Sequence, residues 1–150
     1  MDAIVEKTEI YPTVLVIHPS GYTEFLQIDV NPVSFHELGE LIEAEGLEYV
    51  CCSDSLAKIT KECCLNRNLT MYFDRDSILK GLEYNDVGTM LYGSGAEVMG
   101  AVIIALEDDE CNAYAFDMEE DIEDVFEAID ELTGLLRRET DDDGRYDAWS

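Results

Sequence analysis

Acidic side chains are concentrated in the last third of the chain, and their spacing is the feature of this sequence that best indicates a binding function. On a helix, residues three or four positions apart share one face, with Cβ atoms about 5–6 Å apart. A row of carboxylates at that spacing imitates the charge row of a nucleic-acid strand and can pair with arginine and lysine side chains. The residues predicted to bind a partner in this way are Glu119, Glu120, Glu123, Asp124, Glu127, Asp130 and Glu131.

No basic residue balances these acids in the surrounding sequence. Between Lys80 and Arg137 the chain has 16 Asp and Glu but no Lys or Arg, and the formal net charge of all 150 residues is −26. Direct binding to nucleic acid or to an anionic membrane needs positive charge, so the net charge argues strongly against the first function and also against the second. Mimicry of a nucleic acid, plain solvation and adaptation to salt all remain compatible with this charge.

The C-terminal residues come close to a calcium-binding loop. Acidic oxygens at Glu139, Asp141, Asp143 and Asp147 fall at ligand positions of an EF-hand loop. Ser150 stands where that loop needs a bidentate glutamate. The sequence therefore predicts weak binding of a divalent cation at most, and it predicts no cofactor.

Histidines and cysteines can supply a base, a nucleophile or a metal site. The two histidines, His18 and His36, have no nucleophile motif beside them, so we predict that the protein is not an enzyme. Cys51 and Cys52 are adjacent in an expected strand, where neighbouring side chains point to opposite faces, and this disfavours a shared zinc ion. We expect the cysteines to be free thiols in the cytoplasm.

The elements that must position these residues follow an α+β pattern. Residues 11–18 and 24–30 predict two strands of a hairpin, joined by Pro19-Ser20-Gly21. Ser34 and Glu37 have the spacing of a capping box for a helix that begins at Phe35 and ends near Gly46. Further strands are predicted at 47–53, 69–73, 89–92, 98–106 and 111–116, with Gly93-Ser94-Gly95 as a turn between two of them.

The clearest predicted element is a helix from Asp117 to Arg138. Its apolar residues recur every three or four positions, and the acids at its start and Arg137 and Arg138 at its end suit the helix dipole. We therefore expect a single α+β domain over residues 1–138, with a mainly antiparallel sheet and two main helices, the longer one C-terminal and acidic. Residues 139–150 are expected to form an acidic mobile tail.

Several short motifs between Val14 and Asp108 have the order found in one family. They are Val-Leu-Val-Ile-His-Pro-Ser-Gly, Leu-Gln-Ile-Asp, the helix from Phe35 to Glu45, Leu65-Asn66-Arg67-Asn68 and the glycine-bearing strand that ends with Gly100-Ala-Val-Ile-Ile. This stretch resembles an uncharacterised small domain family of bacterial mobile elements, phages and viruses. The resemblance covers about two thirds of the chain and omits the acidic helix. It implies a viral or mobile-element setting and no particular reaction.

These features together predict a non-enzymatic acidic interaction protein. Its partner would be a basic protein surface, and its sharpest form would be a nucleic-acid-mimicking inhibitor of a host nucleic-acid-binding or defence protein. We expect it to act in the cytoplasm, which would be the host cytoplasm for a viral protein, and to bind neither membranes nor nucleic acid directly. The alternative is a small-ligand or nucleotide-binding module that uses the sheet and its glycine turn.

Overall fold

Strands β1 (Glu9–Ile17) and β2 (Tyr22–Gln27) form the antiparallel hairpin that the sequence predicts, with Leu15 opposite Phe25. Gly21 lies in the turn at a φ of 90°, a conformation that favours glycine. The rest of the sheet is built on this pair in the computed structural model, which describes residues 8–29, 31–52, 56, 67–93 and 95–138.

The strands are ordered β3-β4-β5-β1-β2-β8 across an eight-stranded sheet. Antiparallel pairing joins β3 (Leu47–Cys51) to β4 (Asn68–Asp74), β4 to β5 (Val102–Glu107), and β5 to β1. Only β8 (Arg137–Arg138) pairs in parallel within the described residues, alongside β2. The prediction of a mainly antiparallel sheet is therefore confirmed.

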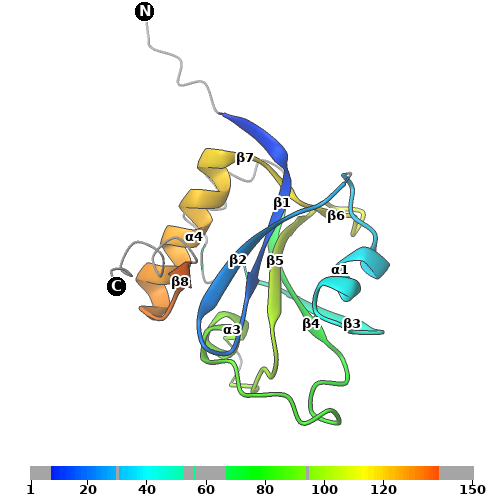
Figure 1. The fold of residues 1–150 in the computed structure, drawn as a ribbon, viewed down its shortest axis with the longest axis vertical. Coiled ribbons are helices and arrows are strands. Elements are labelled where there is room, and N and C mark those ends of the chain that lie inside the picture. The colour runs from blue at the N-terminus through cyan, green and yellow to red at the C-terminus, as the bar shows by residue number, and fades with distance from the viewer. Residues whose placement is uncertain (1–7, 30, 53–55, 57–66, 94, 139–150) are drawn as a thin grey trace, which may run out of the picture.

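The short segment between β5 and the last helix is also part of the sheet (Figure 1). β6 (Ala113–Tyr114) pairs with the end of β5, and β7 (Phe116–Met118) pairs with the first half of β1. Since the second half of β1 pairs with the first half of β5, β6 and β7 occupy the space where those two strands diverge.

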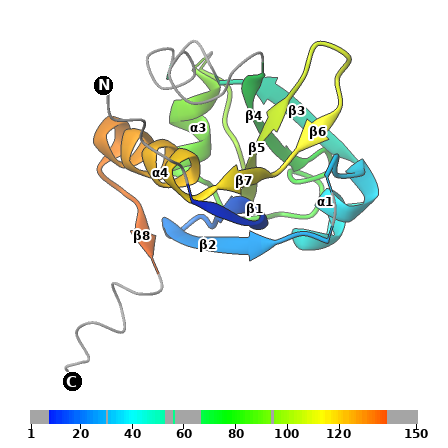
Figure 2. The same ribbon diagram turned by 90° about the horizontal axis from the view of Figure 1, so that it is seen from above.

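Helices cover both faces of the sheet. Helices α3 (Asp86–Tyr92) and α4 (Glu119–Thr133) lie against one face and α1 (Phe35–Leu41) against the other (Figure 1 and Figure 2). Alternate residues of β1 divide between the two cores, because successive side chains of a strand point to opposite faces. Leu15 and Ile17 pack under α3 and α4, whereas Val14 and Val16 pack on the α1 side.

The sequence prediction missed α3. It assigned Thr89–Tyr92 to a strand and Gly93-Ser94-Gly95 to a turn between strands, and both assignments are wrong. Asn85 is the N-cap, and its side-chain oxygen accepts a hydrogen bond from the Gly88 amide at 2.9 Å. Gly93 ends the helix in the left-handed conformation. The described residues therefore hold three helices, where two main helices are predicted.

Two predicted helix ends are also corrected. The Ser34 cap of α1 is confirmed by its 3.0 Å hydrogen bond from the Glu37 amide, but the helix ends at Leu41 instead of near Gly46. Glu43 takes the left-handed conformation there, at a φ of 57°. The last helix spans residues 119–133 rather than 117–138, and Gly134 caps it. Arg137 and Arg138 form β8 and do not sit at the end of the helix.

Two further expectations concern the ends and the surroundings of the chain. The acidic tail predicted at 139–150 lies outside the described residues. Among the helices of the described part, none is both long and apolar enough to cross a membrane. The candidate functional side chains lie on α4, on β8 and at the turn end of the β1–β2 hairpin.

Candidate functional site

Helix α4 has one face in the core and one face in solvent. Ile122, Val125, Phe126 and Ile129 are buried against the sheet, as their spacing predicts. A helix turns by about 100° per residue, so the positions opposite this stripe are 120, 124, 127 and 131. The structure therefore divides the seven predicted partner-binding acids into sets with different surroundings.

The outer row consists of Glu120, Asp124, Glu127 and Glu131. Its spacing of four, three and four residues keeps these side chains on the face opposite the core. Asp124, Glu127 and Glu131 are exposed. Glu120 is half-buried, and its Oε1 accepts a hydrogen bond from the Thr8 amide at 2.7 Å. Asp124, Glu127 and Glu131 are therefore the members of the outer row that face solvent.

The inner row consists of Glu123 and Asp130, which hold the chain that returns after the helix. Glu123 makes a two-pronged ion pair with Arg138, at 2.8 Å from Nη1 to Oε1 and 3.0 Å from Nη2 to Oε2. Asp130 Oδ1 accepts a hydrogen bond from the Leu136 amide at 3.2 Å. The remaining predicted acid, Glu119, is exposed in the first turn, where a negative charge suits the helix dipole.

Arg138 is the residue that the sequence reasoning misplaced. Its guanidinium carbon lies 4.3 Å from the ring centre of Phe25 and 5.1 Å from that of Phe126, beside the Glu123 carboxylate. The expectation that the acids of the helix are uncompensated is wrong for Glu123. A base 15 residues further along the chain, in a two-residue strand, has no periodic signal that would pair it with Glu123.

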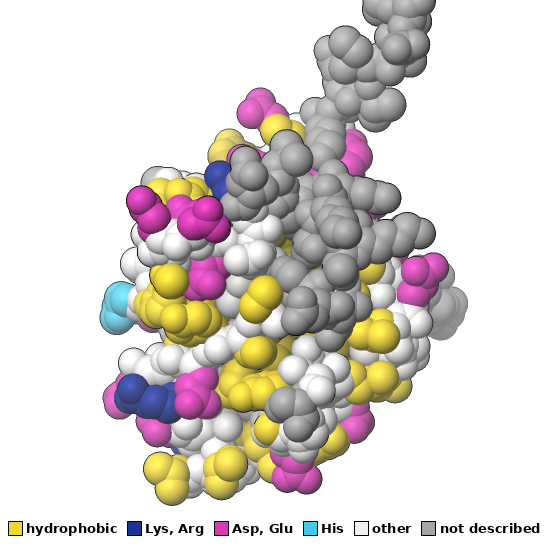
Figure 3. Space-filling model, turned by 180° about the vertical axis from the view of Figure 1, so that it is seen from behind, with side chains coloured by type: hydrophobic (Ala, Val, Ile, Leu, Met, Phe, Trp, Pro, Cys, Tyr) yellow, Lys and Arg dark blue, Asp and Glu magenta, His cyan; other side chains and the backbone are white. Residues whose placement is uncertain are grey.

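Elsewhere the acids are arranged differently. On the face drawn in Figure 3, acidic side chains stand singly or in small groups among hydrophobic and uncharged ones, and dark-blue basic side chains lie beside some of them. Away from α4, Lys80 donates to the Asp74 carboxylate at 2.6 Å. The ordered line of acids on α4 contrasts with this mixed surface.

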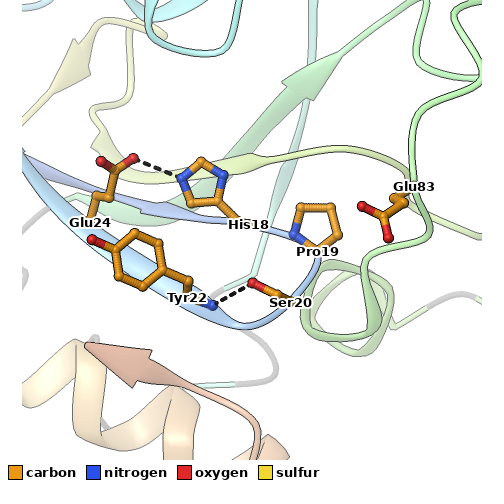
Figure 4. A pocket seen from close by; sticks show the side chains of 6 residues that line it. All are labelled: His18, Pro19, Ser20, Tyr22, Glu24 and Glu83. Atoms are coloured by element: carbon orange, nitrogen blue, oxygen red, sulfur yellow. Dashed lines mark hydrogen bonds and ion pairs between the residues drawn. The ribbon is translucent and has the colours of Figure 1, made fainter. Parts of the chain in front are cut away.

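A second site, which the sequence reasoning did not find, lies at the turn end of the β1–β2 hairpin. We call it the His18 hollow: a pocket of about 490 Å³ lined by His18, Pro19, Ser20, Tyr22, Glu24 and Glu83 (Figure 4). His18 Nε2 lies 2.7 Å from Glu24 Oε1, and the rings of His18 and Tyr22 stack with centroids 5.8 Å apart. Because these residues meet across two strands, their spacing along the chain gives no motif.

The other predicted chemistry has little support in the described residues. They contain no group of three or more His, Cys, Asp or Glu arranged to hold a metal ion. Cys51 is exposed and Cys52 is buried, which agrees with opposite directions on a strand. The divalent-cation candidates Glu139, Asp141, Asp143 and Asp147 lie outside the described residues. His36 is exposed beside Glu40, 3.4 Å away.

Two neighbouring acids at the end of β5 have opposite pKa shifts. Burial raises the pKa of Glu107, and its Oε2 has no hydrogen-bond partner within the described residues. Hydrogen bonds from the amides of Asn112 and Glu110 to Oδ1 help to hold the pKa of Asp108 below its usual range. Burial also raises the pKa of Tyr72, on the neighbouring strand β4.

Comparison of the chain with protein-family models, with curated proteins and with solved structures finds no match. The resemblance drawn from its short motifs therefore stays a prediction.

Proposed function

We propose that this chain is a non-enzymatic interaction protein that binds a basic protein surface through the outer row of α4. In its full form the proposal is inhibition of a nucleic-acid-binding or defence protein by mimicry of nucleic acid. The observation that carries it is the line of Asp124, Glu127 and Glu131 on the exposed face of a helix whose other face is buried. Since that apolar face is already in the core, the helix can offer its charges without giving up its packing.

The spacing of charge supports this proposal. A helix rises about 1.5 Å per residue, so Asp124, Glu127 and Glu131 present one carboxylate per about 5 Å. One strand of B-DNA presents one phosphate per about 3.4 Å of rise. A basic groove that follows phosphates would meet a similar row of negative charge, and the association would be fast and sensitive to salt.

The proposed setting is that of a phage or viral antagonist in the host cytoplasm, and it rests on the resemblance of the motifs between Val14 and Asp108. The alternative is a small-ligand or nucleotide-binding module. The His18 hollow gives the nucleotide version little support, because Glu24 and Glu83 line it and a phosphate group needs donors and positive charge.

The test compares retention of basic proteins by two variants that lose the same charge. The immobilised full chain is incubated with cell lysate and eluted along a salt gradient, and the eluted proteins are identified by mass spectrometry. The outer-row variant carries Asp124→Asn, Glu127→Gln and Glu131→Gln. The matched control removes exposed acids outside α4 through Asp29→Asn, Glu40→Gln and Glu48→Gln.

We expect the unmodified chain and the control to retain a nucleic-acid-binding protein that the outer-row variant loses. A short DNA duplex should release that protein, because mimic and duplex would compete for one groove. Equal retention by both variants would remove α4 from the proposal. Retention that depends on the outer row but resists the duplex would leave a basic partner and eliminate mimicry.

A further inference from the structure

Strand β3 is the outermost strand at one end of the sheet, and its outward backbone groups have no partner strand among the described residues (Figure 1). In an antiparallel pair, residues whose N–H and C=O groups point to the partner alternate with residues whose groups point away. The Arg75 amide donates to the Gly46 carbonyl at 3.0 Å. The Cys52 amide donates to the Leu69 carbonyl at 2.9 Å, so the even-numbered residues face β4. The N–H and C=O groups that point to the open edge belong to Leu47, Tyr49 and Cys51.

The sequence of β3 lacks the features that commonly protect an edge strand. Lysine, proline and β-bulges at an edge hinder the pairing of a further strand. β3 has the sequence Leu-Glu-Tyr-Val-Cys, and its register with β4 runs without a bulge over all five residues. At the other end of the sheet order, β8 is only two residues long. β3 can therefore accept a further strand along its whole length.

Aromatic rings lie beside this edge on both faces of the sheet. A pocket of about 280 Å³ is lined by Leu47, Glu48, Tyr49, Phe73 and Tyr92. The rings of Phe73 and Tyr92 pack on the α3 side, with centres 6.1 Å apart. On the α1 side, the Tyr49 side chain is 46% exposed, and its ring centre lies 6.0 Å from that of Phe35. Because the side chains of an added strand alternate between the two faces, apolar or basic side chains would meet rings on each.

The charge around the edge favours a basic partner. Glu43, Glu45 and Glu48 are exposed just before or within β3. The bases near the end of β4 are Arg75 and Lys80, and Lys80 is already engaged in an ion pair. A second copy of this chain would bring another net charge of −26, so repulsion opposes pairing between two copies. A basic segment would gain electrostatic attraction in addition to backbone pairing.

We propose that β3 is a docking edge for an extended, basic segment of another protein, which adds to the sheet as a further strand. Backbone hydrogen bonds to Leu47, Tyr49 and Cys51 supply the affinity, and the pocket and the exposed Tyr49 ring select the side chains. The inference goes beyond the function proposed for α4 and does not depend on it. β3 and β8, the strand that binds the inner row, stand at opposite ends of the sheet order.

The test measures amide hydrogen exchange and amide chemical shifts of the full chain, labelled with ¹⁵N, by NMR. The probe is a six-residue peptide of alternating arginine and valine, capped at both ends, which combines positive charge with strand propensity. One matched peptide has glutamate in place of arginine and reverses the charge. A second is N-methylated at every residue, so that it keeps its side chains and charge but cannot donate backbone hydrogen bonds.

We expect the free chain to show an alternating exchange pattern along β3. The amides of Leu47, Tyr49 and Cys51 should exchange at least tenfold faster than those of Glu48 and Val50. The arginine peptide should cause saturable shifts along β3 and slow the exchange of the outward amides. The glutamate peptide should bind at least tenfold more weakly, and the N-methylated peptide should not bind.

Cys51→Pro and Gln27→Pro form a matched pair of variants. Cys51 is exposed and its N–H points away from β4, so proline removes one edge donor and leaves the ladder to β4 intact. This change should weaken binding of the arginine peptide by about tenfold, as loss of one hydrogen bond implies. The Ile28 amide donates to the Pro12 carbonyl of β1, so the Gln27 amide points away from β1. Gln27→Pro therefore makes the same change on β2 and should leave binding unchanged.

Slow exchange of every β3 amide in the free chain would overturn the proposal, because the edge would already be paired. Protection that rises with chain concentration would overturn it in favour of a second copy. Equal binding of either matched peptide, or wild-type affinity in Cys51→Pro, would also overturn it. Shifts confined to α4 would do the same and would leave the outer-row proposal intact. Failure of the lysate experiment would not alter the results expected at β3, so the two proposals fail separately.

Discussion

The inner and outer rows of α4 have the same charge on the same helix and opposite relations to the fold. Glu123 and Asp130 are bonded to the returning chain, to Arg138 and to the Leu136 amide. Asp124, Glu127 and Glu131 are exposed on the other side of the same turns. Composition and spacing along the sequence therefore do not reveal which acids are structural. The position of β8 decides it, because that strand brings the Arg138 guanidinium to Glu123.

Among the substitutions that test this comparison, Gly21→Ala is expected to have the largest effect on stability. A Cβ at position 21 would overlap the carbonyl oxygen of Leu135, and Gly21 also has a φ of 90°. Relief of the overlap would push the 135–138 segment away from β2 and break the 2.9 Å hydrogen bond from the Arg137 amide to the Gly21 carbonyl. We expect a loss of about 3 kcal/mol in the free energy of unfolding, measured in urea.

Gly81→Ala is the matched control, because Gly81 has a positive φ of 68° but no neighbour that an added Cβ would meet. It should cost about 1 kcal/mol, from backbone strain alone. If both variants lost the same amount, the fit between the β1–β2 turn and the returning chain would not hold the inner row.

Sequence reasoning succeeded where local periodicity determines the structure. The β-branched run of β1, the rough alternation of β2, the Ser34 cap and the apolar stripe of α4 all carry signals within a few residues, and the elements that they predict are confirmed. Helix α3 was missed because Thr89–Tyr92 is short and apolar enough for a strand. The better signals were its caps: Asn85 at the start and Gly93 at the end.

The site was less predictable because tertiary contacts build it. The split between inner and outer rows depends on a parallel pairing of two residues, Tyr22 with Arg137 and Thr23 with Arg138. The His18 hollow depends on a cross-strand contact and on Glu83, which is distant in sequence. The predicted hairpin, with strands at 11–18 and 24–30, already places His18 and Glu24 on the two sides of its turn, but nothing in the sequence brings Glu83 to them.

The second prediction breaks the inner row directly through Arg138→Ala. This change removes two charge-assisted hydrogen bonds to Glu123 and the stacking on Phe25, while leaving the Glu123 carboxylate half-buried without its partner. We expect a loss of about 2 kcal/mol in the free energy of unfolding.

Arg138→Lys tests the geometry, since it keeps the charge but loses the fork, and should lose about half as much. In a double-mutant cycle, Glu123→Gln combined with Arg138→Ala should cost clearly less than the sum of the single changes. Additive losses would mean that the ion pair is incidental and that ring contacts alone hold Arg138.

The third prediction concerns Glu107, which differs from both rows of α4. In the described residues it has no ion pair such as the one between Glu123 and Arg138, and it is buried, whereas Asp124, Glu127 and Glu131 are exposed. The pKa of Glu107 is raised in the folded protein, so the folded state favours the protonated form more than the unfolded state does. The stabilisation that comes from this difference in pKa is fully present below the unfolded pKa of Glu107, near 4.5, and is lost as the pH rises through the higher folded pKa. Glu107→Gln should therefore stabilise the protein by about 1 kcal/mol at neutral pH.

Denaturant unfolding at several pH values would measure the difference in free energy of unfolding between Glu107→Gln and the unmodified chain. This difference should shrink toward zero as the pH falls to the unfolded pKa of Glu107. Asp109→Asn removes the same charge from an exposed neighbour and controls for the general relief of repulsion at a net charge of −26. An equal gain in Asp109→Asn would assign the effect to net charge. A pH-independent gain in Glu107→Gln would assign it to packing.

The smallest effect is expected in the outer row, from Glu127→Lys. Glu127 is exposed, and its neighbours at i−3 and i+4 are Asp124 and Glu131. Because Glu123 at i−4 and Asp130 at i+3 are also acids, a lysine there replaces four repulsive pairs by attractive ones. These pairs are screened by salt, so the free energy of unfolding should rise by less than about 1 kcal/mol. Glu48→Lys, an equal charge change on an exposed strand residue, separates this local gain from the change in net charge.

A loss of about 1 kcal/mol or more in Glu127→Lys would give the outer row a structural role and end its contrast with the inner row. A gain would mean that folding alone favours a base at this position, where the sequence has an acid flanked by acids. Glu127 would then lower the stability of the fold, and binding of a partner would explain why the sequence has an acid at this position. The decisive combination is therefore a Glu127→Lys chain that is at least as stable as the unmodified protein and no longer retains its basic partner.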